Sequence, residues 1–360
     1  MSEAGRPRVA EIGTVHVFGS YADADVVTLW TNSKRLTWGP PSFRHFSLRA
    51  FFELRRRMKA GEIDLLVVFP PRYPPWSLRS LFAALRDDPL HGLAAMLRTT
   101  GVWFVRFLPR NVPLAVVDID DSFALRRHTF FLLERATLVF KRELPIDHWQ
   151  MFFGSAHADL PTTRIRRRER FKRFLAKVRP ATIGLWHESL PGIPEDRPPE
   201  KTVDVFFAGQ VEPSSTVRRE GITQLRALAA RGYVIDVVEE RLPYEDFVAR
   251  LGRAWLAWSP EGFGWQCYRH YEAPLAWTVP LMNLPRIVRS HPLEEGVHAL
   301  HYEVEGDGLA RAVETALADK PRLLRIAAAA RERVRAHHTF KALCARVIAE
   351  TRAAFRGDSA

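Results

Sequence analysis

The sequence contains very few cysteines and no long apolar run. Only Cys267 and Cys344 occur in 360 residues. Two cysteines are too few for a disulfide framework or a cysteine-rich zinc site, and such low usage is typical of a reducing compartment. No stretch of about 18 consecutive apolar residues is present, and the N-terminal stretch lacks the apolar segment of a signal peptide. We therefore expect a cytoplasmic protein.

Short apolar runs alternate with amphipathic stretches along a chain that is too long for one ordinary core. With 360 residues, of which 47% are hydrophobic, two folded domains of about 150 to 200 residues each are expected. The alternation indicates an α/β fold with doubly wound, largely parallel sheets. Strands are predicted over 15–19, 25–30, 63–69, 113–120, 136–141 and 182–187, and then over 203–209, 233–238, 254–259, 279–283 and 299–304.

Helices and a proline-rich connector complete this organisation. In the second half, helices are predicted over 216–231, 244–252 and 266–277, with three more between 308 and 356. The stretch HESLPGIPEDRPPEKT has four prolines and no apolar periodicity, so it is typical of a linker. The predicted boundaries are 1–190 for the first domain, 191–202 for the linker, 203–336 for the second domain and 337–360 for a C-terminal helix.

Positive charge is in excess and is unevenly distributed. The formal net charge is +12 at pH 7, which favours an anionic partner such as nucleotide phosphates, nucleic acid or an acidic membrane surface. The segment Arg164–Arg179 alone contains nine Lys or Arg and one Glu. Read as a helix, it places Phe171 and Phe174 on one apolar stripe with cations around the rest. A solvated surface helix, a contact with anionic lipid headgroups and a nucleic-acid contact remain open for this segment.

The stretch SPEGFGWQCYRHYEAPLAWTVPLMN, residues 259–283, contains a mixture of polar residues that a core element would not need. Gly262 and Gly264 can adopt positive φ and bring backbone N–H groups close to a ligand, next to a helix start that favours an anion. The stretch resembles the donor-site segment of GT-B glycosyltransferases, and its Gly-Phe-Gly and Cys-Tyr-Arg-His-Tyr-Glu-Ala order is similar to a CgeB-like bacterial family-1-type subgroup. The resemblance covers about residues 203–333. In the first half, VVDIDDSFALRRHTFFLLERATLVFKRELP is similar to the acceptor-side domain of that subgroup.

This resemblance implies a GT-B fold, in which two Rossmann-like domains face a cleft and the last helix packs back toward the first domain. It further implies a sugar transferase that uses a nucleotide-sugar donor and neither a metal nor another cofactor. Glu272 matches the ribose-binding glutamate of the family, and basic residues after the first strand of the donor domain reach the diphosphate in such enzymes. The implied donor-binding residues are Gly209, Arg218, Arg219, Gly262, Phe263, Gly264, Tyr268, Arg269 and Glu272.

Three features limit what the resemblance carries over. The two glutamates of the common family pattern stand closer together than Glu261 and Glu272, which are eleven residues apart, so Glu261 does not inherit a sugar-contacting role. Trp277 and Thr278 replace a frequent glycine before Val-Pro, and either change could reshape the sugar pocket. An Asp-x-Asp spacing occurs within Asp118–Asp121, where it ends a predicted strand, and helix capping or loop formation explains it better than a metal site.

The acceptor and the catalytic base stay unidentified. His16, His45, His128 and Asp120 lie in the first domain and remain open as the base, and the acceptor is a glycan, a lipid or another cell-envelope or small-molecule group. A peripheral contact of Arg164–Arg179 with the anionic inner face of the membrane is a further possible interaction, whereas specific nucleic acid is not expected. Two other functions remain: a basic nucleic-acid-binding protein, for which no recognition module occurs, and an inactive nucleotide or glycan binder with the same fold.

Overall fold

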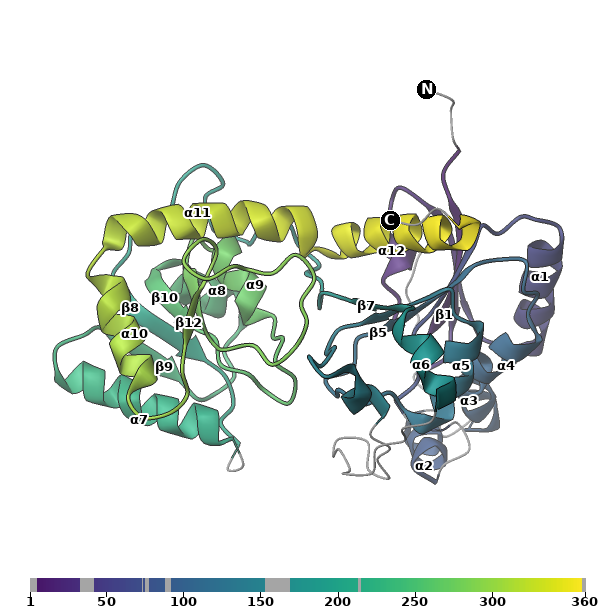
Figure 1. Cartoon of the computed structure of the whole chain (residues 1–360), viewed down its shortest axis with the longest axis horizontal. Helices are drawn as coiled ribbons and strands as arrows, with labels where there is room; N and C mark the ends of the chain where they lie inside the picture. The colour runs from purple at the N-terminus through teal and green to yellow at the C-terminus, as the bar shows by residue number, and fades with distance from the viewer. Residues whose placement is uncertain are drawn as a thin grey trace. The chain divides into compact units, whose positions relative to one another are not determined.

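The computed structural model contains two compact units, each built on one parallel sheet with helices around it (Figure 1). It describes residues 5–32, 42–72, 74, 78–87, 92–152, 169–212 and 215–357. Unit 1 comprises Met1–Ala181 and Cys344–Ala360, and unit 2 comprises Thr182–Leu343. The chain returns from unit 2 to unit 1 within its last helix, α12 (Phe340–Arg356). None of the described helices combines the length and apolarity needed to span a bilayer.

The described part of unit 1 contains a seven-stranded sheet in the order β3-β2-β1-β4-β5-β6-β7. All neighbouring strands are parallel, and the order reverses between β1 and β4, which is the doubly wound arrangement. The strands are β1 (Arg8–Gly13), β2 (Asp25–Trp30), β3 (Phe43–His45), β4 (Leu65–Val68), β5 (Leu114–Asp118), β6 (Leu138–Lys141) and β7 (Val178–Pro180). The helices are α1 (Leu48–Lys59), α2 (Leu78–Asp87), α3 (Gly92–Thr99), α4 (Gly101–Phe104), α5 (Phe130–Arg135) and α6 (Glu169–Leu175).

The predicted strand over 15–19 is wrong, because a buried glutamate holds this segment as a turn. Glu11 on β1 is fully buried. Its carboxylate accepts hydrogen bonds from the backbone N–H groups of Val17 (2.7 Å), Phe18 (3.0 Å) and Gly19 (3.2 Å), and from Thr28 Oγ1 (2.8 Å). Three amides that converge on one carboxylate cannot also join a β-ladder. The first strand therefore lies earlier, at Arg8–Gly13.

The predicted strand over 182–187 is also wrong. Gly184 has a φ of 73°, a conformation that interrupts an extended strand. Leu185 forms only an isolated bridge with Thr339. Its N–H donates to the carbonyl of His338 at 2.8 Å, and its carbonyl accepts from the N–H of Phe340 at 2.8 Å. This segment thus pairs with the junction between α11 (Lys320–His337) and α12 rather than with a sheet.

In the basic segment 164–179, the described helix ends earlier than predicted. Residues 164–168 lie outside the described residues, and α6 ends at Leu175, because Val178 begins β7 beside β6. Phe171 and Phe174 are 3% and 2% exposed. The ring of Phe171 stacks on that of Phe152, with centroids 5.0 Å apart and planes 10° apart. The side of α6 that carries Phe171 and Phe174 is therefore buried in the core of unit 1.

The described part of unit 2 contains a five-stranded parallel sheet in the order β12-β11-β10-β8-β9. The order reverses between β8 and β10, so this sheet is doubly wound as well. Its strands are β8 (Val203–Ala208), β9 (Ile235–Val238), β10 (Ala254–Trp258), β11 (Val279–Asn283) and β12 (Leu300–Tyr302). Its helices are α7 (Thr216–Ala230), α8 (Tyr244–Gly252), α9 (Arg269–Leu275), α10 (Gly308–Leu317) and α11.

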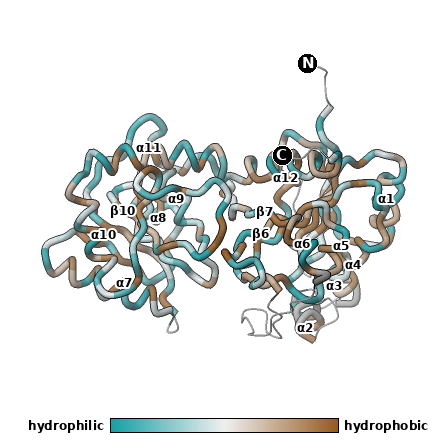
Figure 2. The backbone as a smooth tube through the Cα atoms, in the orientation of Figure 1, coloured by the Kyte–Doolittle hydropathy of each residue, from teal (hydrophilic) through white to brown (hydrophobic). Residues whose placement is uncertain are grey.

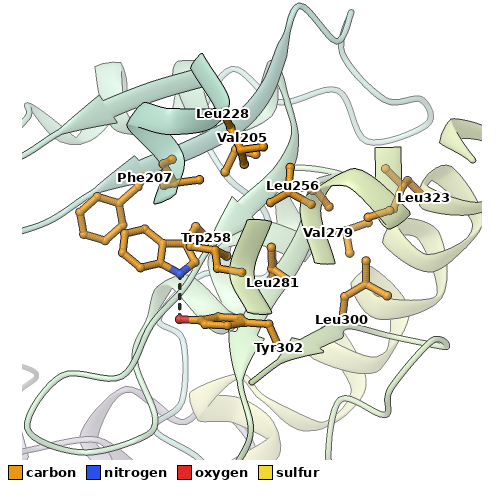
Figure 3. Close-up of a cluster of buried hydrophobic side chains, with 14 of the residues drawn as sticks. Val205, Phe207, Leu228, Leu256, Trp258, Val279, Leu281, Leu300, Tyr302 and Leu323 are labelled. Carbon is orange, nitrogen blue, oxygen red and sulfur yellow. Dashed lines mark hydrogen bonds between the residues drawn. The ribbon is translucent and has the colours of Figure 1, made fainter. Parts of the chain in front are cut away.

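The core of unit 2 is centred on Trp258 of β10 (Figure 3). This indole is fully buried, its Nε1 donates to the hydroxyl of Tyr302 at 2.9 Å, and its ring centroid lies 4.6 Å from that of Phe207. Helix α7 approaches it through Gly221, where an added Cβ would lie 2.1 Å from Trp258 Cζ2. Only a residue without a side chain permits this approach, so Gly221 sets the distance between α7 and the sheet.

Replacing Gly221 with alanine is expected to destabilise the protein. The added methyl group overlaps the Trp258 ring, and overpacking of this kind costs about 1–3 kcal/mol. Urea unfolding would measure the loss. As a control, Glu220→Ala on the exposed side of the same helix should change the free energy of unfolding by less than about 0.5 kcal/mol. Equal stabilities of the two variants would contradict this account of the core.

Candidate functional site

The candidate site lies where the strand order of unit 2 reverses. Gly209 directly follows β8, and Glu261 and Gly262 follow β10, its neighbour in the sheet. Because β8 and β10 are parallel, their carboxyl ends meet at the same edge. Arg218 on α7 and Arg269 at the start of α9 come from the two helices that follow β8 and β10. In open α/β sheets this switch point is where ligands bind.

Arg218 joins the two loops at this edge. Its Nη1 donates to the carbonyl of Gln210 at 2.6 Å, and its Nε donates to the carbonyl of Glu261 at 3.1 Å. A Cβ added at Gly262 would lie 3.2 Å from its Nη2. The side chain therefore brings a positive charge between the loops, close to the backbone of Gly262.

Arg269 places a second guanidinium beside the end of β8. Its Nη2 donates to the carbonyl of Ala208, and its Cζ lies 4.8 Å from the ring centroid of Phe207. Its Nε and Nη1 are buried and have no hydrogen-bond partner within the described part of the chain. Burial lowers the pKa of Arg269, and the neighbouring charge of Arg218 acts in the same direction. Two buried, unsatisfied N–H groups on a cation are costly unless an anion satisfies them.

Gly209 leaves room for the end of the Arg269 side chain. A Cβ at residue 209 would lie 2.8 Å from Nη2 of Arg269. Any larger residue would displace the guanidinium from the carbonyl of Ala208. The reason for a glycine here is thus the close approach of Arg269.

Glu272 lies one turn after Arg269 and lines a pocket of about 430 Å³. Burial raises the pKa of Glu272 to about 7, while the charge of Arg269 and a hydrogen bond from Tyr244 lower it. Burial, and after it the charge of Glu272, raises the pKa of Tyr244 to about 12. The other lining residues include Trp186, His187, Leu190 and Tyr268. A volume in this range suits a small organic molecule.

Most of the other residues predicted to bind the donor are exposed. Neither Gly262 nor Gly264 has a positive φ, contrary to expectation, and the N–H of Gly262 donates to the carbonyl of Gly264 at 3.0 Å. Phe263 between them is 76% exposed. Tyr268 is 45% exposed at the rim of the pocket. Arg219 is exposed on α7, so the structure brings Arg218, rather than Arg219, to the two loops.

Glu261 has a structural partner. Its carboxylate Oε2 lies 3.0 Å from Nε of Arg286, and its backbone N–H donates to Oδ1 of Asn283 at 2.9 Å. The backbone of Glu261 therefore joins the loop after β10 to the end of β11, and its side chain joins it to the loop that follows β11. The absence of a sugar-contacting role for Glu261 stays a prediction.

Trp277 occupies a strained backbone position away from the site. Its φ is 59°, and the N–H groups of Trp277 and Thr278 donate to the carbonyls of Pro274 and Ala273, each at 2.9 Å, as in a Schellman turn. Glycine is usual there because a side chain costs about 1–2 kcal/mol. The indole Nε1 compensates by donating to the carbonyl of Pro194 at 2.9 Å. Because Trp277 precedes β11, it lies at the amino edge of the parallel sheet, opposite the candidate site.

The sequence did not single out five of the residues that line the pocket, among them Tyr244 and Trp186. Tyr244 begins α8, and Trp186 lies in a segment predicted as a strand, and no motif includes either. Both come from parts of the chain distant from residues 259–283. Of the two tyrosines beside Glu272, Tyr271 is the packing residue, since its ring stacks on His338 and its hydroxyl donates to Gln266 Oε1 at 3.1 Å.

The acidic cluster Asp118–Asp121 in unit 1 is held by cations. Asp118 Oδ2 lies 3.2 Å from Lys141 Nζ, Asp120 Oδ2 lies 2.6 Å from Arg126 Nη2, and Asp121 Oδ1 lies 2.8 Å from Arg142 Nη1. Each carboxylate therefore has its own basic partner. Over the residues that the structure describes, no group of three or more His, Cys, Asp or Glu side chains could hold a metal ion.

The four candidates for a base in unit 1 have different surroundings. Asp120 is committed to Arg126, and His128 Nε2 lies 3.0 Å from the carbonyl of Pro71. His16 contacts the rings of Trp30 and Phe43 edge-on, and burial lowers its pKa. His45 contacts the ring of Phe43 edge-on, with centroids 5.7 Å apart. These contacts do not single out one of the four as the base.

Comparison with known proteins supports the fold. No protein-family model and no curated protein matches the chain. A glycosyltransferase from Rickettsia africae aligns with 98% of this chain and 99% of its own, at 8% identity and a TM-score of 0.52. The fold class is thus the predicted one, α/β of the GT-B type, with two Rossmann-like units.

Two further solved structures are similar over most of their length. One is an alpha-glucosyltransferase in complex with UDP and a 13-mer DNA, with 9% identity, a TM-score of 0.49, and coverage of 97% of this chain and 100% of its own. The other is HepE from Anabaena in complex with UDP, with 11% identity, a TM-score of 0.47, and coverage of 95% and 100%. The narrower CgeB-like resemblance stays a prediction.

The buried Glu272 should make the protein's stability depend on pH. Its pKa is raised from 4.5 to about 7 on folding, so the folded state binds more protons between these values. Its contribution to stability is complete below about pH 4.5 and is lost as pH rises through 7. Glu272→Gln lacks this loss, and its stability relative to wild type should rise by on the order of 1–3 kcal/mol between pH 5 and 8. Urea unfolding at several pH values would test this, and parallel curves for the two proteins would contradict it.

Proposed function

We propose that this protein is a glycosyltransferase whose unit 2 binds the nucleotide-sugar donor and whose unit 1 receives the acceptor. The observation that supports this most is the buried guanidinium of Arg269, with two N–H groups that have no acceptor within the described part of the chain. It lies at the switch point of the sheet, near Arg218 and one helical turn from Glu272. Two cations beside a carboxylate and a pocket match the parts of a nucleoside diphosphate: phosphates, ribose and base.

Each part of the donor would have a distinct partner. The diphosphate would accept hydrogen bonds from Arg269 and Arg218, since charge-assisted bonds to phosphate are strong. The ionised carboxylate of Glu272 would accept hydrogen bonds from the ribose hydroxyls. The base would enter the pocket beside Tyr244, Tyr268 and Trp186, where aromatic faces favour stacking.

The same cations would serve the reaction. When the bond between the sugar and the diphosphate breaks, negative charge grows on the leaving phosphate oxygens. Guanidinium groups already oriented toward that position stabilise the charge without reorganisation. In this proposal Arg218 and Arg269 supply the positive charge, and no metal is required. The acceptor hydroxyl oxygen would bond to the anomeric carbon of the sugar as the diphosphate leaves, and its proton would pass to a base in unit 1.

Removal of the Arg269 charge should weaken donor binding without harming the fold. Arg269→Met keeps the packing against Phe207 and removes the two unsatisfied N–H groups, but it also removes the bond to the carbonyl of Ala208, so the melting temperature of the ligand-free protein should change little. Loss of charge-assisted bonds of about 1.5–3 kcal/mol should weaken binding by about ten- to a hundredfold. Thermal shifts with UDP-, GDP-, ADP-, CMP- and dTDP-sugars would measure this, since a ligand at about 100 times its Kd stabilises by about 2.7 kcal/mol.

The matched control is Arg226→Met. Arg226 is exposed and lies about two turns beyond Arg218 on α7. It should bind the donor as wild type does. Absence of any thermal shift in the wild type, or equal effects of the two variants, would count against the proposed donor site. Release of nucleoside diphosphate from the bound donor, with and without candidate acceptors, would separate a transferase from an inactive binder of the same fold.

Donor affinity should increase as pH rises through about 7, because ribose hydroxyls donate to an ionised Glu272. The hydrogen bond from Tyr244 lowers the pKa of Glu272, so Tyr244→Phe should move the midpoint upward by about half a unit to one unit. Isothermal titration with the intact nucleotide-sugar is the measurement, since its diphosphate, esterified at both ends, does not titrate in this range. Glu272→Gln should remove the dependence. A midpoint that is the same in wild type and Tyr244→Phe would refute the role of Tyr244.

A further inference from the structure

Helix α2 in unit 1 has a row of exposed apolar side chains. The helix packs on α3, and Leu81 is half-buried. On another side, Leu78, Phe82 and Leu85 are 73%, 67% and 46% exposed. Their spacing of four and three residues aligns them in one row along the helix. Figure 2 shows hydrophobic colour along α2. A continuous row of three large apolar residues differs from scattered exposed ones and marks a binding surface.

The charge of the chain is concentrated in the same unit. The residues of unit 1 include 33 Lys or Arg and 19 Asp or Glu, a net charge of +14. Those of unit 2 include 20 and 22, a net charge of −2. The whole positive excess of the protein therefore belongs to the unit that carries the apolar row. Two exposed arginines, Arg72 and Arg86, lie before and within α2.

We propose that unit 1 binds the surface of an anionic lipid bilayer, with Leu78, Phe82 and Leu85 of α2 inserted between the headgroups. An amphipathic helix lies in the membrane interface when it combines large apolar residues with surrounding cations. A second copy of the chain is disfavoured as the partner, since two units that each carry a net charge of +14 repel each other. Nucleic acid would bind the positive charge of unit 1, but it would not bury the exposed apolar side chains of α2.

This surface differs from the one predicted from the sequence. That prediction placed the membrane contact on residues 164–179. The phenylalanines of α6, however, pack inside unit 1, with Phe171 3% and Phe174 2% exposed. Among the described helices of unit 1, α2 has three exposed large apolar residues in one row, whereas α1 has two, Leu48 and Phe52.

Vesicle co-sedimentation of the full chain tests the proposal. The wild type should bind vesicles of phosphatidylcholine with roughly 40% phosphatidylglycerol, bind pure phosphatidylcholine weakly, and lose binding as salt is raised. The triple variant Leu78→Ser, Phe82→Ser, Leu85→Ser should partition at least about tenfold less. The matched control, Leu48→Ser with Phe52→Ser, removes two apolar side chains of α1 that are 44% and 58% exposed. It should bind within about twofold of wild type.

The other outcomes overturn the proposal. Binding by the triple variant equal to wild type would make the contact purely electrostatic, and equal loss in the α1 control would remove α2 from it. Sedimentation with duplex DNA but not with vesicles would assign the charge to nucleic acid. If the wild type forms a dimer that the triple variant does not form, and neither binds vesicles, the partner is a second copy of the chain. Thermal shifts with nucleotide-sugars should be the same in all variants, so failure here is distinguishable from failure of the proposed donor site.

Discussion

The parallel pairing of β8 with β10 is the constraint on which the candidate site depends. These strands are separated in sequence by α7, β9 and α8, yet they are neighbours in the sheet, and the chain leaves them in opposite directions. Their carboxyl ends therefore open next to each other, and the loop at Gly209 meets the loop at Glu261. Arg218 can join both loops only because the strand order reverses at this point. The same reversal places Arg269 against the last carbonyl of β8.

The site shows how a protein can keep an unfavourable group where a ligand would need it. Arg269 is held by one backbone carbonyl and by the face of Phe207, and its other N–H groups have no partner in the described chain. Glu272 is held in a pocket that opposes its ionisation. An interior selected only for stability would pair or replace both groups. Other buried charges are paired or hydrogen-bonded, for example Lys141 with Asp118, and Glu11 with three backbone N–H groups.

The two units differ in the way they meet other molecules. Unit 2 is close to electrically neutral, and its cations at the switch point are few and individually placed. Unit 1 carries the positive excess, together with the apolar row on α2. Such a division suits a protein in which one unit recognises a small anionic ligand by geometry and the other approaches an extended anionic surface by charge.

The sequence alone determined the class of fold and most elements of unit 2. Apolar periodicity and turn residues are local signals, so α8 and β11 have the predicted bounds. Only the tertiary structure decided the rest, because it depends on groups far apart in the chain. Residues 15–19 form a turn because their amides bind the carboxylate of Glu11, although their sequence favours a strand. Leu185 pairs with residues more than 150 positions away. Tyr244 and Trp186 reach the pocket of Glu272 only through folding, since no local pattern records which distant side chains will share a cavity.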